Sequence, residues 1–511
     1  MLPKAENSWT IFEAAHLLNR AGFGGSPSDI REFHALGRER AVDSLLKPTE
    51  ALDAFPLPSW AAKDQALADV RATIESRIAL KVTMREMSPE DAENAKREAN
   101  KAMQQEARQR ELEALSWWFL RMLKTRAPLR EKLTLFWHDH FATSIQKVKE
   151  PVLLVQQNDL FRKQAFGSFK DLTQAILLDP AMTLYLDTES SKKGYPNENF
   201  AREIMELFTL GEGNYSEQDV REAARAFTGY QFNRREGKVY HNTRQWDPGE
   251  KTIFGQTGAF TGKDAINLIF QKPQAARFMA RKLWEFFVYE KPSDAALDIL
   301  TASFLKSDFR VGPLLREIFL SQEFYSESAI RSQVKCPVQF MVQILKQLEI
   351  SDPPKAFPLA AQQQLGQVLF MPPNVAGWDW GQAWINTNTL FTRYNLAGFI
   401  TTSSSSNSLI PQDETMNAKG MGPAKGMGPA KRMARSWKGP DYEKIAPRPL
   451  REKPADLVDS LVFRFFQSPV PEKARKSFLE YAIQKKGAIF TDHETAELCH
   501  LMLSTPYYQL T

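Results

Sequence analysis

The sequence predicts a mainly α-helical protein, with a large multi-helix body of orthogonal, bundle-like packing and a small β element near residues 230–260. Apolar residues recur at helical spacing in most segments, and capping residues and glycines mark many helix ends. Only residues 230–260 combine β-branched and aromatic residues with turn signals, as strands do. With 511 residues and 43% apolar content, the chain can fill one large or two to three ordinary cores.

Composition excludes several classes of protein. The net charge of +5 comes from 66 basic and 61 acidic residues that are interleaved, so we expect no nucleic-acid binding. Cys336 and Cys499 lie far apart, which indicates neither a disulfide framework nor a zinc finger. No apolar run reaches the length of a membrane span, and the N-terminus lacks the apolar region of a signal peptide. We therefore predict a cytoplasmic location, with export alongside a partner left open.

Shifts in composition divide the chain into three parts. Residues 1–400 form the predicted main helical body, from which the charge-dense segment 61–112 projects as a solvated helical hairpin. Residues 401–454 are rich in Gly, Pro, Ser and Lys and predict a flexible linker. Residues 455–511 return to amphipathic helices, which we expect to dock on the main body because their faces are too apolar to stand free.

The N-terminal region predicts two helices. Thr10 and Glu13 form a capping box for a helix through Ala21, and Ser28 caps a second helix toward residue 36. His16 and Arg20 lie one turn apart on the first helix. Two interpretations stay open for this pair: a surface contact, or part of a polar site.

The strongly amphipathic segment 116–144 carries the most informative histidines. His140 shares a face with Leu129 and Leu133, whereas His138 points about 160° away, so the two cannot bind one metal on a regular helix. A buried neutral imidazole needs a hydrogen-bond partner for its N–H group. We weigh a satisfied core histidine against a metal-binding or catalytic role, with a glutamate of the segment described next as the partner.

Residues 196–230 form a predicted helical hairpin that holds the candidate carboxylates. Asn197 caps a helix that runs to residue 210, and Glu203 and Glu206 lie on a stripe bordering its apolar face. Gly211 ends this helix, and Ser216 caps the next one with Asp219 at its third position. Because Glu203 and Glu206 border the core, we predict that they meet His140, with Asp219 nearby.

Two later segments add further candidates. The β element carries His241 and Asp247 as its chemically useful side chains. The loop and helix at residues 371–395 carry a set of residues that could stack on a sugar ring or contact a partner: Trp378, Asp379, Trp380 and Trp384. The alternative is that these tryptophans fasten the loop to the core, because tryptophan usually supplies buried area.

Seven collinear segments resemble one bacterial family, the domain-of-unknown-function 1800 family. They are HLLNRAGFGGSPSDI, LTLFWHDHFATS, DPAMTLYLD, GYPNENFAREIMELFTLGEGNYSEQDVREAARAFTGY, KTIFGQTGAF, ARFMARKLWEFFV and PPNVAGWDWGQAWINTNTL. The resemblance implies a predominantly helical protein, often encoded beside an exported partner of the domain-of-unknown-function 1501 family, which looks like an alkaline-phosphatase or sulfatase relative. It implies no established reaction, so no catalytic residue is carried over. The chain departs from the family in its charge-dense segment 61–112 and in its linker.

Two functions follow as hypotheses. The favoured one is a non-catalytic scaffold that binds a partner protein or a surface polysaccharide, because no reaction motif is present. The alternative is an enzyme with a carboxylate–histidine site of Glu203, Glu206 and His140, which would use a divalent metal or acid/base chemistry.

Overall fold

The computed structural model describes residues 1–402, 437–485 and 490–511. Within them the protein is mainly α-helical, with two small two-stranded sheets, so the predicted fold class is confirmed. One large hydrophobic core joins helices from every part of the described chain. No helix in these residues is both long and apolar enough to cross a membrane.

The N-terminal segment folds into three short helices. They are α1 (Ile11–Arg20), α2 (Pro27–Ala35) and α3 (Arg38–Leu46). The capping box of Thr10 and Glu13 is present as predicted. The cap of α2 differs from the prediction, because Ser26 rather than Ser28 pairs with Asp29 in a second capping box. Pro27 favours this start, since proline suits the first position of a helix.

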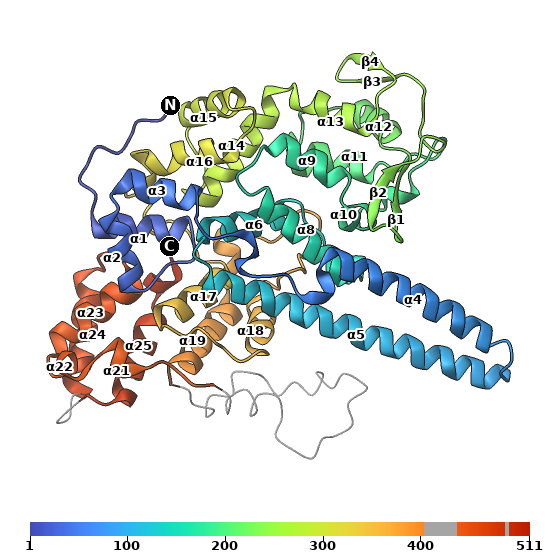
Figure 1. The fold of residues 1–511 in the computed structure, drawn as a ribbon. Coiled ribbons are helices and arrows are strands. Elements are labelled where there is room, and N and C mark those ends of the chain that lie inside the picture. The colour runs from blue at the N-terminus through green and yellow to red at the C-terminus, as the bar shows by residue number, and fades with distance from the viewer. Residues whose placement is uncertain (403–436, 486–489) are drawn as a thin grey trace.

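Two long helices form an arm that projects from the body. Figure 1 shows α4 (Lys63–Thr83) and the first part of α5 (Pro89–Lys124) running side by side away from the other elements. We call residues 63–112 the arm. From Ala114 onward α5 enters the body, where Trp118, Phe119 and Met122 are fully buried. The apolar end of α5 therefore anchors the arm.

The centre of the body is built on α6, which is packed against α5 and α8. The helices that follow α5 in the chain are α6 (Pro128–His140), α7 (Ile145–Val148), α8 (Pro151–Lys163), α9 (Phe169–Leu177) and α10 (Pro180–Tyr185). Glu131 on α6 accepts hydrogen bonds from Arg121 Nε on α5 (2.7 Å) and from Arg162 Nε on α8 (2.6 Å). All three side chains are buried, so one carboxylate joins three helices.

The predicted hairpin 196–230 differs from a regular helix pair. After α11 (Asn199–Glu203) the chain continues as a π-helix over Ile204–Thr209, in which the Leu210 N–H reaches back five residues to the Met205 carbonyl (2.8 Å). A π-helix has a wider turn than an α-helix, so the 3.6-residue spacing used to place Glu206 does not apply here. Gly211 ends the helix with a positive φ of 82°, as predicted, and α12 (Glu217–Ala226) follows.

The predicted β element forms two hairpins beyond α12. In the first, β1 (Tyr230–Asn233) pairs antiparallel with β2 (Lys238–His241), with Tyr230 opposite His241. In the second, β3 (Lys251–Ile253) pairs with β4 (Gln256–Gly258). The helices after the strands are α13 (Gly262–Phe270), α14 (Pro273–Phe287), α15 (Asp294–Lys306) and α16 (Val311–Leu320).

The remaining helices bring the end of the chain back to its beginning. They are α17 (Pro337–Gln347), α18 (Phe357–Leu365), α19 (Thr387–Thr402), α21 (Tyr442–Ile445), α22 (Arg448–Arg451), α23 (Pro454–Phe466), α24 (Glu472–Lys485) and α25 (Asp492–Leu503). Leu510 forms a β-bridge with Val334, and Figure 1 shows the C-terminus beside α1.

The predicted linker, residues 401–454, has two parts. Residues 403–436 lie outside the described residues. Residues 437–454 contradict a flexible linker, because they include α21 and α22 and pack on the body. The Trp437 ring lies 5.1 Å from the Phe357 ring and 5.3 Å from the Phe399 ring, and the Tyr442 hydroxyl donates to the Thr401 carbonyl (2.7 Å). The packing of Trp437 and Tyr442 on the body holds this segment in place, although its Pro and Lys content predicted a flexible linker.

The Glu131 cluster yields a stability prediction. Glu131→Gln leaves two buried guanidinium groups without a counter-ion, so we expect the free energy of unfolding to fall by about 3–5 kcal/mol. The matched control is Glu106→Gln, because Glu106 is 60% exposed in its ion pair with Arg110, and we expect a loss below about 1 kcal/mol. Urea unfolding followed by circular dichroism measures both. Equal losses in the two variants would show that the buried ion pairs of Glu131 stabilise the fold no more than the exposed ion pair of Glu106 does.

Candidate functional site

His140, the central residue of the predicted site, is held by the backbone and a lysine. Its Nε2 lies 3.0 Å from the Phe208 carbonyl oxygen, and its Nδ1 lies 3.2 Å from Lys282 Nζ. A carbonyl only accepts and an ammonium only donates, so His140 is neutral and carries its proton on Nε2. Burial lowers the pKa of His140 well below its usual value, and the charge of Lys282 adds to this. The partner of His140 is a carbonyl of the π-helix instead of a glutamate.

The three predicted carboxylates make contacts with other groups. Glu203 and Glu206 are partly exposed, and Glu206 accepts a hydrogen bond from the Tyr215 hydroxyl. Burial, and then the charge of Glu206, raise the pKa of Glu203. Asp219 accepts from the backbone N–H of Ser216 (2.9 Å) and of Phe254 (2.7 Å), so it caps α12 and holds the turn after β3.

These residues do not form a common centre in the described structure. No hydrogen bond or ion pair within residues 1–402, 437–485 and 490–511 links His140 to Glu203, Glu206 or Asp219. In the same residues, no group of three or more His, Cys, Asp or Glu side chains is arranged to hold a metal ion. The predicted divalent-metal site is therefore not assembled from this part of the chain.

The candidates of the β element serve its packing. The His241 ring stacks on Tyr230, with 4.6 Å between ring centroids. Asp247 accepts from Arg225 Nε (2.8 Å) and from the Gly249 N–H (2.9 Å), and Arg225 holds the pKa of Asp247 below its usual value. Both side chains thus fasten the strands to α12 and to each other.

The tryptophan loop is mostly fastened to the core. Trp378 is buried with its ring 5.7 Å from that of His138, and Trp384 is buried as well. Trp380 is 45% exposed, although its ring edge contacts Phe286 at 5.1 Å between centroids. Asp379 is exposed. Of the four predicted contact residues, Trp380 and Asp379 are therefore the ones accessible to another molecule.

Asp139, which was not among the predicted site residues, connects α6 to this loop. Its Oδ1 accepts a hydrogen bond from the Trp378 N–H (2.7 Å). Gly377 has a φ of +89°, and a Cβ there would lie 2.4 Å from Asp139 Oδ1, so only glycine allows this approach. Burial raises the pKa of Asp139 to about 7, although the Trp378 N–H and Lys282 oppose the shift. Its position between two histidines was the available sequence signal.

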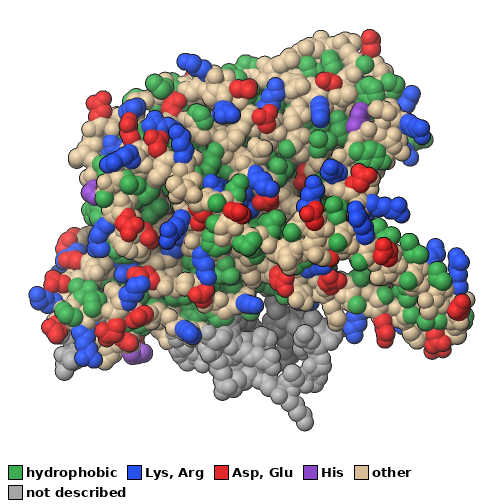
Figure 2. All heavy atoms as spheres, viewed as in Figure 1, with side chains coloured by type: hydrophobic (Ala, Val, Ile, Leu, Met, Phe, Trp, Pro, Cys, Tyr) green, Lys and Arg blue, Asp and Glu red, His purple; other side chains and the backbone are tan. Residues whose placement is uncertain are grey.

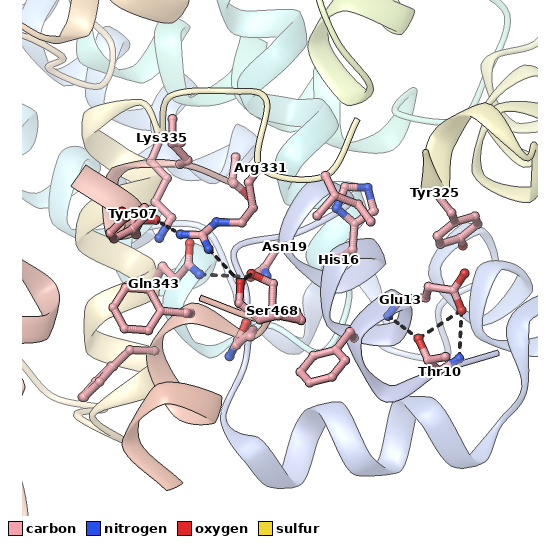
Figure 3. Close-up of a pocket in the computed structure, with 18 of the residues that line it drawn as sticks. Thr10, Glu13, His16, Asn19, Tyr325, Arg331, Lys335, Gln343, Ser468 and Tyr507 are labelled. Carbon is pink, nitrogen blue, oxygen red and sulfur yellow. Dashed lines mark hydrogen bonds between the residues drawn. The ribbon is translucent and has the colours of Figure 1, made fainter. Parts of the chain in front are cut away.

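His16 lines a cavity of about 260 Å³ that opens between α1, α17 and the C-terminal segment (Figure 3). Its Nε2 lies 2.9 Å from the Phe324 carbonyl oxygen, and burial, with the charge of Arg20 adding to it, lowers the pKa of His16 to about 3. Arg20 is also buried and donates from Nε to the Phe287 carbonyl (3.0 Å). The interpretation of His16 and Arg20 as a surface pair is wrong, because the C-terminal segment and the helices after α14 cover α1.

The other polar residues of this cavity come from segments without a recognisable motif. Figure 3 shows Arg331, Lys335, Gln343 and Tyr507 toward one end, and Thr10, Glu13 and Tyr325 toward the other, with His16 and Asn19 between them. The sequence signal for Lys335 was a lysine within the mostly apolar stretch VKCPVQF. The cavity joins residues more than 300 positions apart, which local patterns do not reveal.

The raised pKa of Asp139 yields a pH prediction. The folded protein holds this proton up to about pH 7, whereas the ordinary pKa is 3.8. The contribution of Asp139 to the free energy of unfolding is therefore greatest below pH 4 and decreases as the pH rises toward 7. In Asp139→Asn the amide oxygen still accepts from Trp378 but cannot ionise, so this loss should disappear. We expect urea unfolding to show wild type weakening relative to the variant by up to about 1.4 kcal/mol per pH unit; parallel pH curves would contradict this.

Comparisons with known proteins place the chain in one family. No curated protein and no solved structure matches it. A sequence model of the family described as "Protein of unknown function (DUF1800)" matches residues 16–510. The match spans nearly the whole chain and contains α6, the hairpin with the π-helix, the tryptophan loop and the C-terminal helices. The chain therefore belongs to the DUF1800 family, a family of unknown function.

Proposed function

We propose that the protein is a non-catalytic scaffold that binds a partner protein through the tip of its arm. The observation that supports this is a set of apolar side chains at the free end. Ile78 and Val82, one helical turn apart on α4, are 58% and 55% exposed, and Met87 in the turn is 39% exposed. We call these three residues the tip patch. Apolar side chains gathered at one exposed end are typical of a contact surface for another protein.

The stem of the arm is held together without the tip patch. Arg110 on α5 donates to Asp69 on α4 (2.7 Å) and to Glu106 (2.6 Å). Arg77 Nη2 contacts the Met103 sulfur at 3.5 Å. Figure 2 shows the arm extending beyond the body with hydrophobic side chains exposed between basic and acidic ones. The tip patch thus adds little to the stability of the arm, which leaves it available for binding.

The family resemblance suggests the occupant. It implies that proteins of this family are often encoded beside a partner of the domain-of-unknown-function 1501 family, and we propose that such a partner covers the tip patch. Because the arm is where this chain departs from the family, the place of contact rests on the tip patch alone. A surface polysaccharide is the second ligand class predicted from the sequence. It has less support, because Trp378 and Trp384 are buried and leave Trp380 and Asp379 as the accessible residues of the tryptophan loop.

The enzyme alternative has less support than the scaffold. Both ring nitrogens of His140 are engaged, by the Phe208 carbonyl and by Lys282, and Asp219 is engaged by two backbone N–H groups. Glu203 and Glu206 remain as neighbouring acids at a helix edge, without the imidazole that the predicted chemistry requires.

The test is a direct binding measurement between the purified full chain and the proposed 1501-family partner. Ile78→Asp with Val82→Asp should weaken binding at least about tenfold, because two carboxylates would have to be desolvated in an apolar contact. The matched control is Asn100→Asp with Gln104→Asp, which adds the same charge at exposed positions one turn apart on the stem.

The control should bind within about twofold of wild type, where tenfold corresponds to 1.4 kcal/mol. Both double variants should keep the unfolding midpoint of wild type, since all four positions are exposed. Unchanged affinity in the tip variant, or equal losses in tip and stem variants, would overturn the proposal that the tip patch is the contact surface.

A further inference from the structure

Several basic side chains are buried without an acidic partner. Arg20, Lys132, Lys335 and Arg393 are exposed by 4% or less. In the described residues none of them forms an ion pair with an Asp or Glu side chain; each donates to carbonyl or amide oxygens instead, as Lys132 Nζ does to Gln339 Oε1. Burying a positive charge without a counter-ion is costly. No described Asp or Glu side chain therefore compensates these four basic groups, and Arg20 instead contacts an oxygen of Thr511 (3.2 Å).

Lys335 brings this charge to the cavity shown in Figure 3. Its Nζ donates to the Tyr508 carbonyl (2.7 Å) and lies 3.6 Å from the centroid of the Tyr508 ring. Arg331, which also lines the cavity, donates to the Pro469 carbonyl (3.3 Å) and to the Tyr507 carbonyl. Carbonyls and an aromatic face satisfy part of these donors, but they supply no negative charge.

The acidic residue that lines this cavity, Glu13, does not neutralise Lys335. Its carboxylate accepts from the Thr10 N–H (2.8 Å) and pairs with Arg38 (3.2 Å), and Figure 3 shows it at the opposite end of the cavity from Lys335. Burial lowers the pKa of Lys335 well below its usual value, and Arg331 and Arg393 add to this. An anion beside Lys335 would favour the charged lysine, so binding and protonation would support each other.

The rest of the cavity wall combines polar and apolar side chains, and the apolar part is extensive. It includes rings and aliphatic side chains from α1, from the end of α23 and from the C-terminal segment: Phe12, Phe465, Phe466, Tyr507 and Leu510. The volume of about 260 Å³ lies just below the range of about 300–1,000 Å³ that is usual for ligand pockets. A small molecule with one acidic group and a short apolar part matches both the charge and the size.

We propose that this cavity binds a small organic anion, with its acidic group against Lys335 and Arg331 and its apolar part against Phe465 and Phe466. The acidic group is a carboxylate or a phosphate, since both accept hydrogen bonds from lysine and arginine. The anion supplies the negative charge that the described side chains around Lys335 lack. This site is separate from the tip patch and does not rest on the partner-binding proposal.

The test uses the full chain and four probes of equal chain length. Hexanoate and hexyl phosphate carry the anion, whereas hexanol and hexylamine share the apolar part without it. Because a ligand that binds only the folded state stabilises it, the two anions should raise the thermal unfolding midpoint with increasing concentration, and the other two should not. Competition between hexanoate and hexyl phosphate, followed by ligand-observed NMR, tells which acidic group is preferred.

Two lysine variants separate binding from structure. Lys335→Met should weaken anion binding at least about tenfold, yet keep or raise the ligand-free midpoint, because it removes an unpaired buried charge. Lys132→Met is the matched control. Lys132 is also buried without an acidic partner, but it does not line the cavity, so anion binding should persist. Arg331→Gln should weaken anion binding as well, measured on the folded protein below its unfolding midpoint, because Arg331 also contacts the Pro469 and Tyr507 carbonyls. Equal shifts with hexanol and hexanoate, or undiminished anion binding in both Lys335→Met and Arg331→Gln, would overturn the proposal.

Discussion

The arm and the body depend on one buried carboxylate. Glu131 binds Arg121 and Arg162, and Arg121 also donates to the Phe55 carbonyl (2.6 Å) and the Leu52 carbonyl (3.0 Å) in the segment that leads into α4. The segment that leads into α4 and the buried end of α5 are therefore both held by contacts of Arg121. A solvated helical pair that would be marginal on its own is held in a defined direction by interactions at its base.

Elsewhere in the body, several buried polar side chains form hydrogen bonds with backbone carbonyls. His16 contacts the Phe324 carbonyl and His140 the Phe208 carbonyl, and both imidazoles are neutral because burial disfavours their charged form. Such contacts satisfy orphan carbonyls at helix ends and turns, which would otherwise be costly to bury. Residues that look catalytic in sequence thus have backbone partners here, whereas the tip patch is exposed to solvent and Lys335 has no acidic partner among the described side chains.

Local signals in the sequence predicted much of the fold. The capping box of Thr10 and Glu13, the amphipathic helical pattern around His140 and the turn-rich β element all depend on neighbouring residues, and all are present. The π-helix was missed because a regular 3.6-residue spacing was assumed, and it supplies the carbonyl that replaces the expected glutamate beside His140. Backbone partners of this kind carry no sequence signature.

Features built from distant segments could not be predicted. The cavity combines His16 with Lys335 and Tyr507, whose proximity depends on the return of the C-terminus to α1. Likewise, the burial of Trp378 depends on Asp139 and Gly377 meeting across 238 residues of chain. Long-range packing of this type follows from the complete core rather than from any window of sequence.

The proposal that this protein binds a partner through the tip of its arm is tested by amide hydrogen exchange, measured on the full chain with and without the proposed 1501-family partner. If the tip patch is the contact surface, exchange slows at residues 74–90 and is unchanged at residues 377–384 of the tryptophan loop. Protection at the tryptophan loop or within the body, with the arm unaffected, would contradict it.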